Sequence, residues 1–284
     1  MHTYTLLEKF LFFPRCRLNS AVLHEKVRGK TILITGASSG IGEKTAYVLA
    51  EAPVHLILVA RREEKLLAMK KDMSGKPAHV SVFRADLRNK EEMEALLAFL
   101  HGLPGGLDLV VSNAGLSIRR SIGDSLGRYH DFTRTMAINY FAPVQLLLSV
   151  IPLLKQAKGH VIHVSTINAL LMPVPYWAAY QASKSAFDTW FRSASPELNA
   201  MGISTTSIYL PLVKTPMIEP TVAYQNMPAM STDHVAAIIC QAIYTKRTTY
   251  APWWLPLGQW ASVLFRSSAE WIFPRLLRKK RNRP

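Results

Sequence analysis

The sequence predicts an α/β fold, with one doubly wound parallel β-sheet in a single domain that carries terminal extensions. The chain has 284 residues, of which 49% are hydrophobic and 19% charged, so it can bury one sizeable core. Short β-rich apolar runs alternate with longer segments of helical spacing, which is typical of repeated βαβ units. A glycine-rich turn follows the first of these runs and leads into a helix.

Six apolar runs are predicted to be strands, with helical segments between them. The strands are expected at 31–35, 54–60, 79–85, 107–112, 160–165 and 203–210, and helices at 41–51, 90–100 and 178–200. We expect a Rossmann-type domain over 29–252. An apolar and basic extension precedes it at 1–28, and an aromatic and basic extension follows it at 253–284.

The turn TGASSGIG at 35–42 lies where a Rossmann-type sheet binds the phosphates of a dinucleotide. Its glycines allow a tight turn and let backbone amides approach a pyrophosphate, while the helix N-terminus adds a favourable dipole. Such turns also serve as plain connections, but the position between a strand and a helix favours phosphate binding. The predicted phosphate loop comprises Gly36, Ser38, Ser39, Gly40, Ile41 and Gly42.

Five further motifs follow this turn along the chain. They are Asp86 after the third strand, Asn113-Ala114-Gly115 after the fourth, Asn139 in a helical segment, a strand ending in Ser165-Thr166, and Tyr180-Gln-Ala-Ser-Lys184. Together with the GxxxGxG spacing of the turn, this series resembles the short-chain dehydrogenase/reductase family over roughly residues 29–252. The resemblance implies hydride transfer between a nicotinamide and a carbonyl or alcohol carbon, with a proton moving to or from the oxygen.

Tyr180 and Lys184 are one helical turn apart and can share a helix face. A phenol with a pKa near 10 is a poor acid–base catalyst at neutral pH, and a neighbouring ammonium is expected to lower that pKa. The resemblance assigns Tyr180 as proton donor and places Lys184 also at the nicotinamide ribose. Such a pair on a surface helix often only packs, but the other five motifs favour catalysis.

Further roles are implied by the resemblance alone. Asn139 would hold a water in a proton relay, the alternative being a buried asparagine that satisfies helix backbone. Asp86 and Leu87 would contact the cofactor. The turn Asn113-Ala114-Gly115 would stabilise the central strand and lie near the adenosine ribose.

The hydroxyl that assists Tyr180 is open between two neighbours. The family uses the second of two hydroxyl residues at the strand end, which here is Thr166. The interval to Tyr180 is one residue longer than usual, so that counting back from Tyr180 reaches Ile167. Ser165 and Thr166 point to opposite faces of a strand, and only one can face the substrate. We predict Thr166, with Ser165 as the alternative.

A second departure follows the sixth strand, where the family has Pro-Gly before a V-x-T motif. Leu210 and Pro211 occupy those two positions, while Val213 and Thr215 remain to contact the nicotinamide amide. Losing the glycine changes how closely the backbone can approach the cofactor.

The end of the second strand indicates which cofactor is preferred. A carboxylate there would bind the ribose 2′-hydroxyl of NAD, whereas arginine suits the 2′-phosphate of NADP. The sequence has Arg61 and Arg62, which predicts NADP(H) over NAD(H). The alternative is that both arginines only cap a loop in solvent.

The segment 213–230 lies where the family builds a variable substrate lid, and it is rich in proline and methionine, which predicts an adaptable apolar wall. The series STINALLMPVPYWAAYQASK and LPLVKTPMIEPT is similar to the branch with bacterial fatty acyl-CoA reductases. We therefore expect a reductase of a lipid-like carbonyl. A dehydrogenase of a steroid-like or polyketide alcohol, a catalytically inactive cofactor sensor, and a dinucleotide-binding protein with a nucleic-acid-binding tail are the alternatives.

The C-terminal extension combines tryptophans with a basic run, which is typical of an interfacial membrane anchor. The tryptophans are Trp253, Trp254, Trp260 and Trp271, and the basic residues are Arg275, Arg278, Lys279, Lys280, Arg281 and Arg283. Trp253 and Trp254 could equally close the core or a subunit contact. The uncharged stretch 251–265 is too short to span a bilayer. The aromatics stand beside the basic run rather than within it, which disfavours nucleic acid.

The formal net charge is +15, with much of it at the ends of the chain. Cys16 and Cys240 fit neither a disulfide framework nor a metal site, and the N-terminus lacks the features of a secretory signal. We expect a cytoplasmic protein that also binds the inner face of a membrane peripherally. The resemblance further implies a homo-oligomer.

Overall fold

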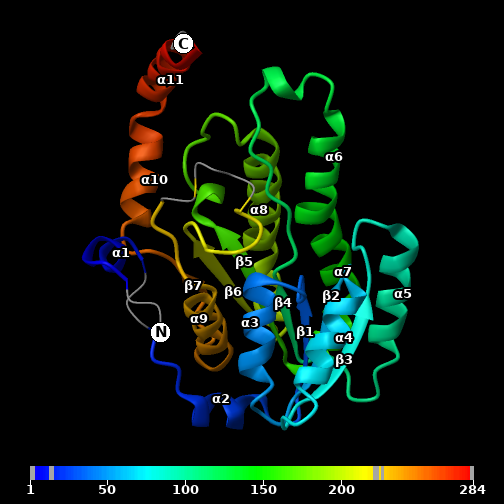
Figure 1. The fold of residues 1–284 in the computed structure, drawn as a ribbon. Helices are drawn as coiled ribbons and strands as arrows, with labels where there is room; N and C mark the ends of the chain where they lie inside the picture. The colour runs from blue at the N-terminus through cyan, green and yellow to red at the C-terminus, as the bar shows by residue number, and fades with distance from the viewer. Residues whose placement is uncertain (1–3, 13–15, 220–223, 225–226, 282–284) are drawn as a thin grey trace.

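A seven-stranded parallel sheet forms the centre of the computed structural model, which describes residues 4–12, 16–219, 224 and 227–281. The strand order is β3-β2-β1-β4-β5-β6-β7, and helices cover both faces of the sheet (Figure 1). The chain reverses its direction of travel across the sheet between β1 and β4. This is the doubly wound fold that the sequence predicts.

The six predicted strands are all present, with ends within two residues of those expected. The strands are β1 Thr31–Thr35, β2 His55–Ala60, β3 His79–Arg84, β4 Leu109–Ser112, β5 His160–Thr166, β6 Ser204–Leu210 and β7 Thr249–Tyr250. The seventh strand was not predicted, because two residues are too few to show a pattern.

Helices alternate with the strands and extend the fold at both ends. They are α1 Leu6–Leu11, α2 Ser20–Val27, α3 Gly40–Leu49, α4 Glu63–Asp72, α5 Lys90–His101, α6 Tyr129–Met136, α7 Ala142–Ala157, α8 Ala178–Ala200, α9 Thr232–Thr245, α10 Leu255–Leu264 and α11 Arg266–Arg281. A π-helical segment, Ala137–Phe141, joins α6 to α7. By length and composition, the helical stretch Tyr129–Ala157 could cross a membrane. Its buried residues, however, pack in the core beside the sheet.

The hydrophobic core is divided into two layers by the sheet. Neighbouring residues of β1 belong to different layers: Ile32 and Ile34 pack with α3 and α9, and Leu33 packs with α5, α7 and α8. This follows from the alternation of side chains along a strand. Both faces of the central strands are therefore buried, as is usual for a parallel sheet.

The N-terminal extension packs against the main body of the protein. Tyr4 and Phe12 are buried in the same core layer as α2, and the Tyr4 hydroxyl lies 3.0 Å from Nδ1 of His234. The indole nitrogens of Trp253 and Trp254 donate to the carbonyl oxygens of Phe10 and Leu11, at 2.8 and 3.0 Å. The end of α1 thus lies beside the start of α10 (Figure 1).

Helices α10 and α11 form an arm that projects from the body (Figure 1). The base of the arm is attached to the loop after β5, because the backbone N–H of Met172 donates to Oγ of Ser262 at 3.0 Å. A Cβ added to Gly258 would lie 3.0 Å from Cδ2 of Leu171. The arm therefore contacts the same loop from two positions on α10.

Two histidines are buried in β5. His163 lies edge-on to the rings of Phe187 and Phe191, and within the described chain neither of its ring nitrogens has a hydrogen-bond partner. Burial lowers the pKa of His163 well below its ordinary value and that of His160 to about 3. Both rings are therefore neutral in the folded protein at neutral pH.

We predict that the free energy of unfolding falls as the pH drops below about 6.5, the pKa of an unfolded histidine. Below that pH the unfolded chain binds protons at positions 160 and 163 that the folded chain does not, so stability is present above the window and lost beneath it. Each histidine contributes a slope of about 1.4 kcal/mol per pH unit.

Urea titrations of His163→Leu at pH values from 7 to 5 measure how the free energy of unfolding changes with pH. The slope of that free energy against pH should be smaller than in the unchanged protein by the contribution of one histidine. His101→Gln, an exposed change on α5, should keep the slope of the unchanged protein. Equal slopes for all three proteins would contradict the assignment.

Candidate active site

Asn113 joins the carboxyl ends of β1 and β4, where the chain reverses across the sheet. Its Nδ2 donates to the carbonyl oxygens of Thr35 and Gly36, at 3.0 and 3.3 Å. In return, Oγ1 of Thr35 accepts from the backbone N–H groups of Asn113 and Ala114, at 3.0 and 3.1 Å. These bonds fix the loop between β1 and α3 against the loop after β4. In a doubly wound sheet, ligands bind at this point of reversal.

The loop between β1 and α3 fits a pyrophosphate, because its backbone leaves no room for side chains. Gly36 and Gly40 have φ of 67° and 59°, in the left-handed region that favours glycine. A Cβ on Gly36 would lie 2.9 Å from Cα of Ala114, and one on Gly42 would lie 2.5 Å from the carbonyl oxygen of Gly36. The predicted loop thus has the close backbone packing and the following helix N-terminus that a dinucleotide needs.

Arg62 is positioned by the same loop. Its Nε and Nη2 donate to Oγ of Ser38, at 3.2 and 3.0 Å, and Nη2 also donates to the Ser38 carbonyl oxygen at 3.1 Å. Arg61 is exposed, and both arginines line the cavity described below. Asp86 is engaged by Arg88, whose hydrogen bonds hold the pKa of that carboxyl below its ordinary value. At the carboxyl ends of β2 and β3, the arginine side chains that line the cavity therefore outnumber the carboxylates.

The structure separates the two hydroxyls at the end of β5. Oγ of Ser165 donates to the buried carboxylate of Asp188 at 3.5 Å. The Thr166 hydroxyl instead lies beside Tyr180, where it opposes the rise in the pKa of the phenol that burial causes. The neighbours thus serve opposite faces of the strand, and the side chain beside Tyr180 is that of Thr166.

The additional residue between Thr166 and Tyr180 is accommodated in the loop. β5 ends at Thr166, a 3₁₀ turn follows at Ile167–Ala169, and Tyr176 takes a φ of 72° just before α8 begins. Ile167 therefore begins the turn and does not replace Thr166 at the strand end.

The protonation of Tyr180 differs from the sequence-based expectation. Desolvation raises the pKa of Tyr180 to about 12, and the hydrogen bond with Thr166 opposes this rise. We expected Lys184 to lower the pKa, but its Nζ donates to the carbonyl oxygen of Val164 at 3.3 Å. Burial also lowers the pKa of Lys184 to about 8, although the Asp188 carboxylate acts to raise it. The lowered pKa of Lys184 weakens the effect of its positive charge on Tyr180.

Asn139 holds the backbone of the loop after β4. Its Oδ1 accepts from the Leu116 N–H at 2.8 Å, and its Nδ2 donates to the Leu116 carbonyl oxygen at 2.8 Å and to Oγ of Ser183 at 2.9 Å. Asn139 is 2% exposed and does not line the cavity. The backbone that it satisfies is that of a loop and not of a helix, as the alternative had it, and its part in a proton relay stays a prediction. The π-helical segment that carries it is of a kind frequent at functional sites.

The segment after β6 approaches the phosphate loop despite the Leu210-Pro211 departure. A Cβ on Gly40 would lie 3.1 Å from Cγ2 of Thr215, and Val213 forms a β-bridge with Met230. Of the predicted lid over 213–230, residues 220–223 and 225–226 lie outside the described residues.

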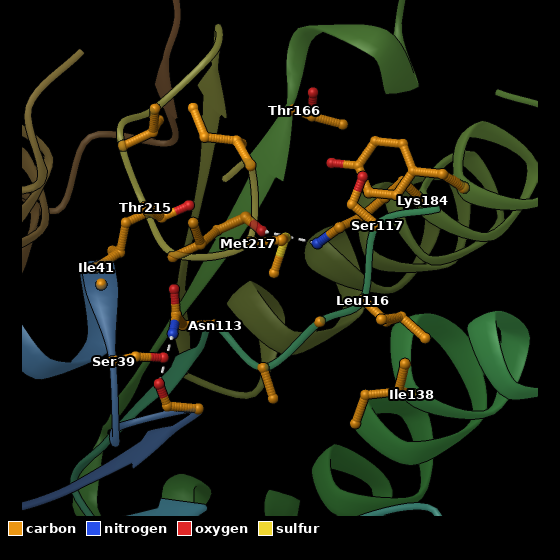
Figure 2. A pocket seen from close by; sticks show the side chains of 18 of the residues that line it. Ser39, Ile41, Asn113, Leu116, Ser117, Ile138, Thr166, Lys184, Thr215 and Met217 are labelled. Carbon is orange, nitrogen blue, oxygen red and sulfur yellow. Dashed lines mark hydrogen bonds between the residues drawn. The ribbon is translucent and has the colours of Figure 1, made fainter. Parts of the chain in front are cut away.

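One cavity of about 690 Å³ brings the predicted residues together. In Figure 2, Ser39, Ile41 and Thr215 lie at one side of it, and Thr166, Ser117 and Lys184 at the other. All predicted site residues line this cavity except Asn139 and Gly42, which lie directly behind it. The fold thus joins the phosphate loop and Tyr180 in a single space.

The structure adds residues that the motifs did not predict. Trp177 stacks on Tyr224 with ring centroids 5.8 Å apart and meets the Tyr180 ring edge-on at 5.5 Å. Trp177 is the N-cap residue of α8, and its position three residues before Tyr180 could have indicated it. The added lining residues include Ser117, Arg134, Ile138, Val174, Trp177, Tyr224 and Met227.

Comparisons with known proteins agree with this geometry. The sequence model of the short chain dehydrogenase family matches residues 30–226. A fatty acyl-CoA reductase of Acinetobacter baylyi is 39% identical over 246 residues, covering 86% of this chain and 82% of that protein. A fatty acyl-CoA reductase of Mycobacterium tuberculosis is 37% identical over 225 residues, covering 79% of this chain and 76% of that protein. The resemblance seen in the sequence is confirmed.

Solved structures share the fold. A short-chain dehydrogenase from Sphingobium yanoikuyae, solved in complex with NADPH, superposes with a TM-score of 0.73 at 22% sequence identity. The match covers 85% of this chain and 93% of the other.

Proposed function

The chain belongs to the short-chain dehydrogenase family of oxidoreductases, and we propose that it reduces the carbonyl of an apolar, lipid-like substrate with NADPH. The observation that carries this proposal is the pairing of Thr166 with Tyr180 in one cavity with the phosphate loop. Fatty acyl-CoA, a fatty aldehyde or a long-chain ketone would each present a suitable carbonyl. The names of the two bacterial relatives favour the acyl-CoA.

The site residues would divide the work between binding and proton transfer. A nicotinamide dinucleotide supplies the hydride when bound. The phosphate loop and the arginines after β2 would hold its phosphates. Tyr180, protonated at neutral pH, would donate its proton to the carbonyl oxygen, and Thr166 would hold that oxygen by a hydrogen bond. Lys184 would bind the ribose from its place beside Gly115, where an added Cβ would lie 3.6 Å from Nζ.

The apolar wall supports a lipid-like substrate. Val174, Trp177, Met217, Ile218 and Met227 line the cavity. Of these, Trp177 lies edge-on to the Tyr180 ring. Methionines adapt to chains of different length because their side chains are unbranched and flexible. A long alkyl chain would lose its contact with water there.

The cofactor preference rests on the end of β2. A 2′-phosphate would meet Arg61 and Arg62, and a guanidinium binds phosphate with two parallel hydrogen bonds. The Asp86 carboxylate, already engaged by Arg88, would not compete for the ribose hydroxyl. These contacts support NADPH over NADH.

We also propose that the protein works in the cytoplasm and binds the inner face of a membrane through its arm. Exposed apolar side chains lie along α1, α10 and α11, including Leu6, Phe10, Leu257, Trp260, Val263, Leu264, Phe265 and Trp271. Arg266, Arg275 and Arg278 add positive charge, and the guanidinium of Arg275 lies over the Trp271 ring. Apolar and cationic side chains together suit an anionic lipid surface. The side chains of Lys279, Lys280 and Arg281, and residue Arg283, lie outside the description.

Tyr180→Phe should lower kcat for reduction of a long-chain acyl-CoA with NADPH by roughly 10²–10⁴-fold, because it removes the proton donor. Thr166→Ala should lower kcat by about 10–100-fold, since it leaves Tyr180 without its hydrogen bond. Thr166→Ser keeps the hydroxyl and should stay near the original rate.

Ser165→Ala is the matched control, because Ser165 faces Asp188 and not Tyr180. Ser165→Ala should lower the free energy of unfolding, because the contact with Asp188 is lost, and should leave kcat near that of the unchanged protein. A loss in Ser165→Ala equal to that in Thr166→Ala would contradict the assignment of Thr166. If no acyl-CoA, aldehyde, ketone or steroid is turned over despite NADPH binding, the proposed reductase is wrong.

Arg61→Gln should raise the KM for NADPH by about 10–100-fold and leave that for NADH little changed, because it removes a charge-assisted hydrogen bond to the 2′-phosphate. Steady-state kinetics with both cofactors measures this. Lys65→Gln, on an exposed position of α4 that does not line the cavity, should change neither value. A parallel rise for both cofactors would show that Arg61 does not select the phosphate.

Binding to vesicles of phosphatidylglycerol should be weakened at least about tenfold by Trp260→Glu together with Val263→Glu, because both apolar side chains would leave the lipid. Flotation of protein with vesicles measures the bound fraction. Leu67→Glu, an equally apolar and exposed position on α4, is the control and should bind as before. Binding that survives the double substitution would exclude the arm as the anchor.

A further inference from the structure

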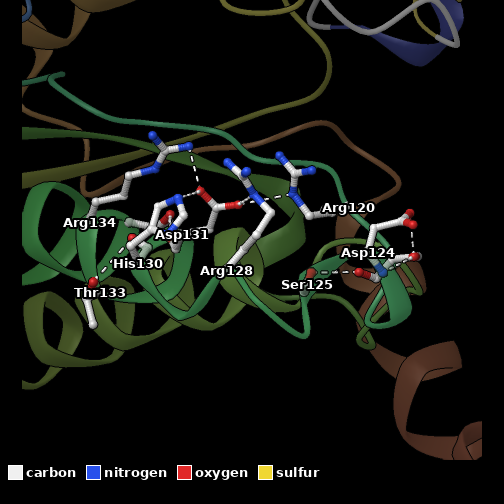
Figure 3. Close-up of polar contacts among 10 residues, drawn as sticks. Arg120, Asp124, Ser125, Arg128, His130, Asp131, Thr133 and Arg134 are labelled. Carbon is white, nitrogen blue, oxygen red and sulfur yellow. Dashed lines mark hydrogen bonds and ion pairs between the residues drawn. The ribbon is translucent and has the colours of Figure 1, made fainter.

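Three arginines converge on one carboxylate at the start of α6 (Figure 3). Nε of Arg120 and Nε of Arg128 lie 3.0 and 2.9 Å from Oδ2 of Asp131, and Nη2 of Arg134 lies 2.6 Å from Oδ1. The Asp131 side chain is 2% exposed. Hydrogen bonding by Arg128 holds the pKa of that carboxyl below its ordinary value, so Asp131 stays ionised.

The cluster carries more positive charge than its fold requires. One guanidinium would compensate a buried carboxylate, and three are present. Asp124, on the neighbouring turn, is bonded by the Ser121 hydroxyl at 2.6 Å, and even with this carboxylate counted the cluster stays cationic. The guanidinium-bearing side chains are 33–40% exposed, so their remaining donors can reach a ligand.

Arg134 connects the cluster to the catalytic cavity. It lines the cavity, and its Nε is buried with no hydrogen-bond partner among the described residues. The Arg134 side chain is 40% exposed, so its other guanidinium nitrogens can be reached from outside the cluster. Arg134 thus belongs both to the cluster and to the lining of the cavity.

Arg119, the neighbour of Arg120 in the sequence, adds a fourth positive charge. Its guanidinium lies 4.8 Å from the ring centroid of Tyr176, which precedes the cavity residue Trp177. Its charge acts on Tyr224, where it opposes the rise in pKa that burial causes. Positive charge therefore also acts on Tyr224, which lines the cavity.

We infer that Arg120, Arg128 and Arg134 form an anion subsite that binds the phosphate of a coenzyme A-type thioester while its acyl chain occupies the cavity. This inference rests on the proposed function, because it concerns the part of the same substrate that does not react. A guanidinium group binds two phosphate oxygens through two parallel hydrogen bonds, and the three guanidinium groups of the cluster are partly exposed. The phosphate loop and Arg61 lie at the other end of the cavity and remain for the dinucleotide.

The test uses ligands that cannot react and a protein whose dinucleotide site is filled with NADP⁺. S-decyl-coenzyme A, S-decyl-4′-phosphopantetheine and S-decyl-pantetheine carry the same chain with decreasing numbers of phosphates. Calorimetry gives the Kd of each for the unchanged protein and for Arg120→Gln with Arg128→Gln. Arg134 is kept so that Asp131 retains a partner. Lys70→Gln with Lys155→Gln, both exposed, on α4 and α7, and outside the cavity lining, is the charge-matched control.

In the double variant we expect the Kd of the phosphate-bearing ligands to rise by about tenfold or more, with that of S-decyl-pantetheine unchanged. The coenzyme A and phosphopantetheine arms identify which phosphate is bound. Arg120→Lys with Arg128→Lys should recover part of the affinity, since charge remains without the paired donors. Equal losses for all three ligands, or no loss, would overturn the subsite.

Failure of the subsite differs from failure of the reductase. An unchanged KM for acyl-CoA in an active double variant would remove the subsite and leave the function standing. Phosphate-dependent binding of S-decyl-coenzyme A by a protein that turns over no acyl-CoA would leave the subsite standing and remove the reductase. Unchanged NADPH affinity and melting temperature in the variants exclude misfolding as the cause.

Discussion

The clasp between Asn113 and Thr35 is the constraint on which the site depends. It holds the ends of β1 and β4 together where the chain reverses across the sheet. Because Nδ2 of Asn113 would lie 3.0 Å from a Cβ on Gly36 and 2.8 Å from one on Gly42, the clasp also requires glycine at both positions. The glycine spacing of the sequence therefore reflects the side-chain amide of Asn113, in the loop after β4. A phosphate loop held in this way is organised before any ligand binds.

A second organising element is the alternation of side chains at the end of β5. Ser165 turns inward to Asp188, whose other oxygen accepts from Nε of Arg192 at 2.8 Å. Thr166 turns outward to Tyr180. Asp188 also favours the ammonium form of Lys184, so the inward face tunes the charge of a group on the outward side. Consecutive residues at the end of the strand thus have different partners, Asp188 for Ser165 and Tyr180 for Thr166.

Local sequence was enough for much of this arrangement. The main strands, the phosphate loop and the Tyr180–Lys184 helix have periodicity or spacing that a short window contains. The two-residue β7 has neither. The preference for Thr166 over Ser165 needed strand geometry, and the insertion before Tyr180 was absorbed in a loop that no pattern describes.

The pKa of Tyr180 was predicted in the wrong direction because burial depends on Trp177, Tyr224 and the rest of the tertiary structure. The arginine cluster was missed for the same reason: its members are scattered over 120–134 and meet only through Asp131.

The bonds between α10 and the loop after β5 have a thermodynamic consequence. The loop that begins at Thr166 shares the contacts of Met172 and Leu171 with α10, so displacing the helix and loosening the loop are linked equilibria. Linkage is reciprocal: a ligand that favours the ordered loop must strengthen the seating of α10 by the same free energy with which α10 strengthens that ligand's binding. The gain in affinity of such a ligand when α10 is attached, and the gain in attachment of α10 when that ligand is bound, would therefore have the same free energy.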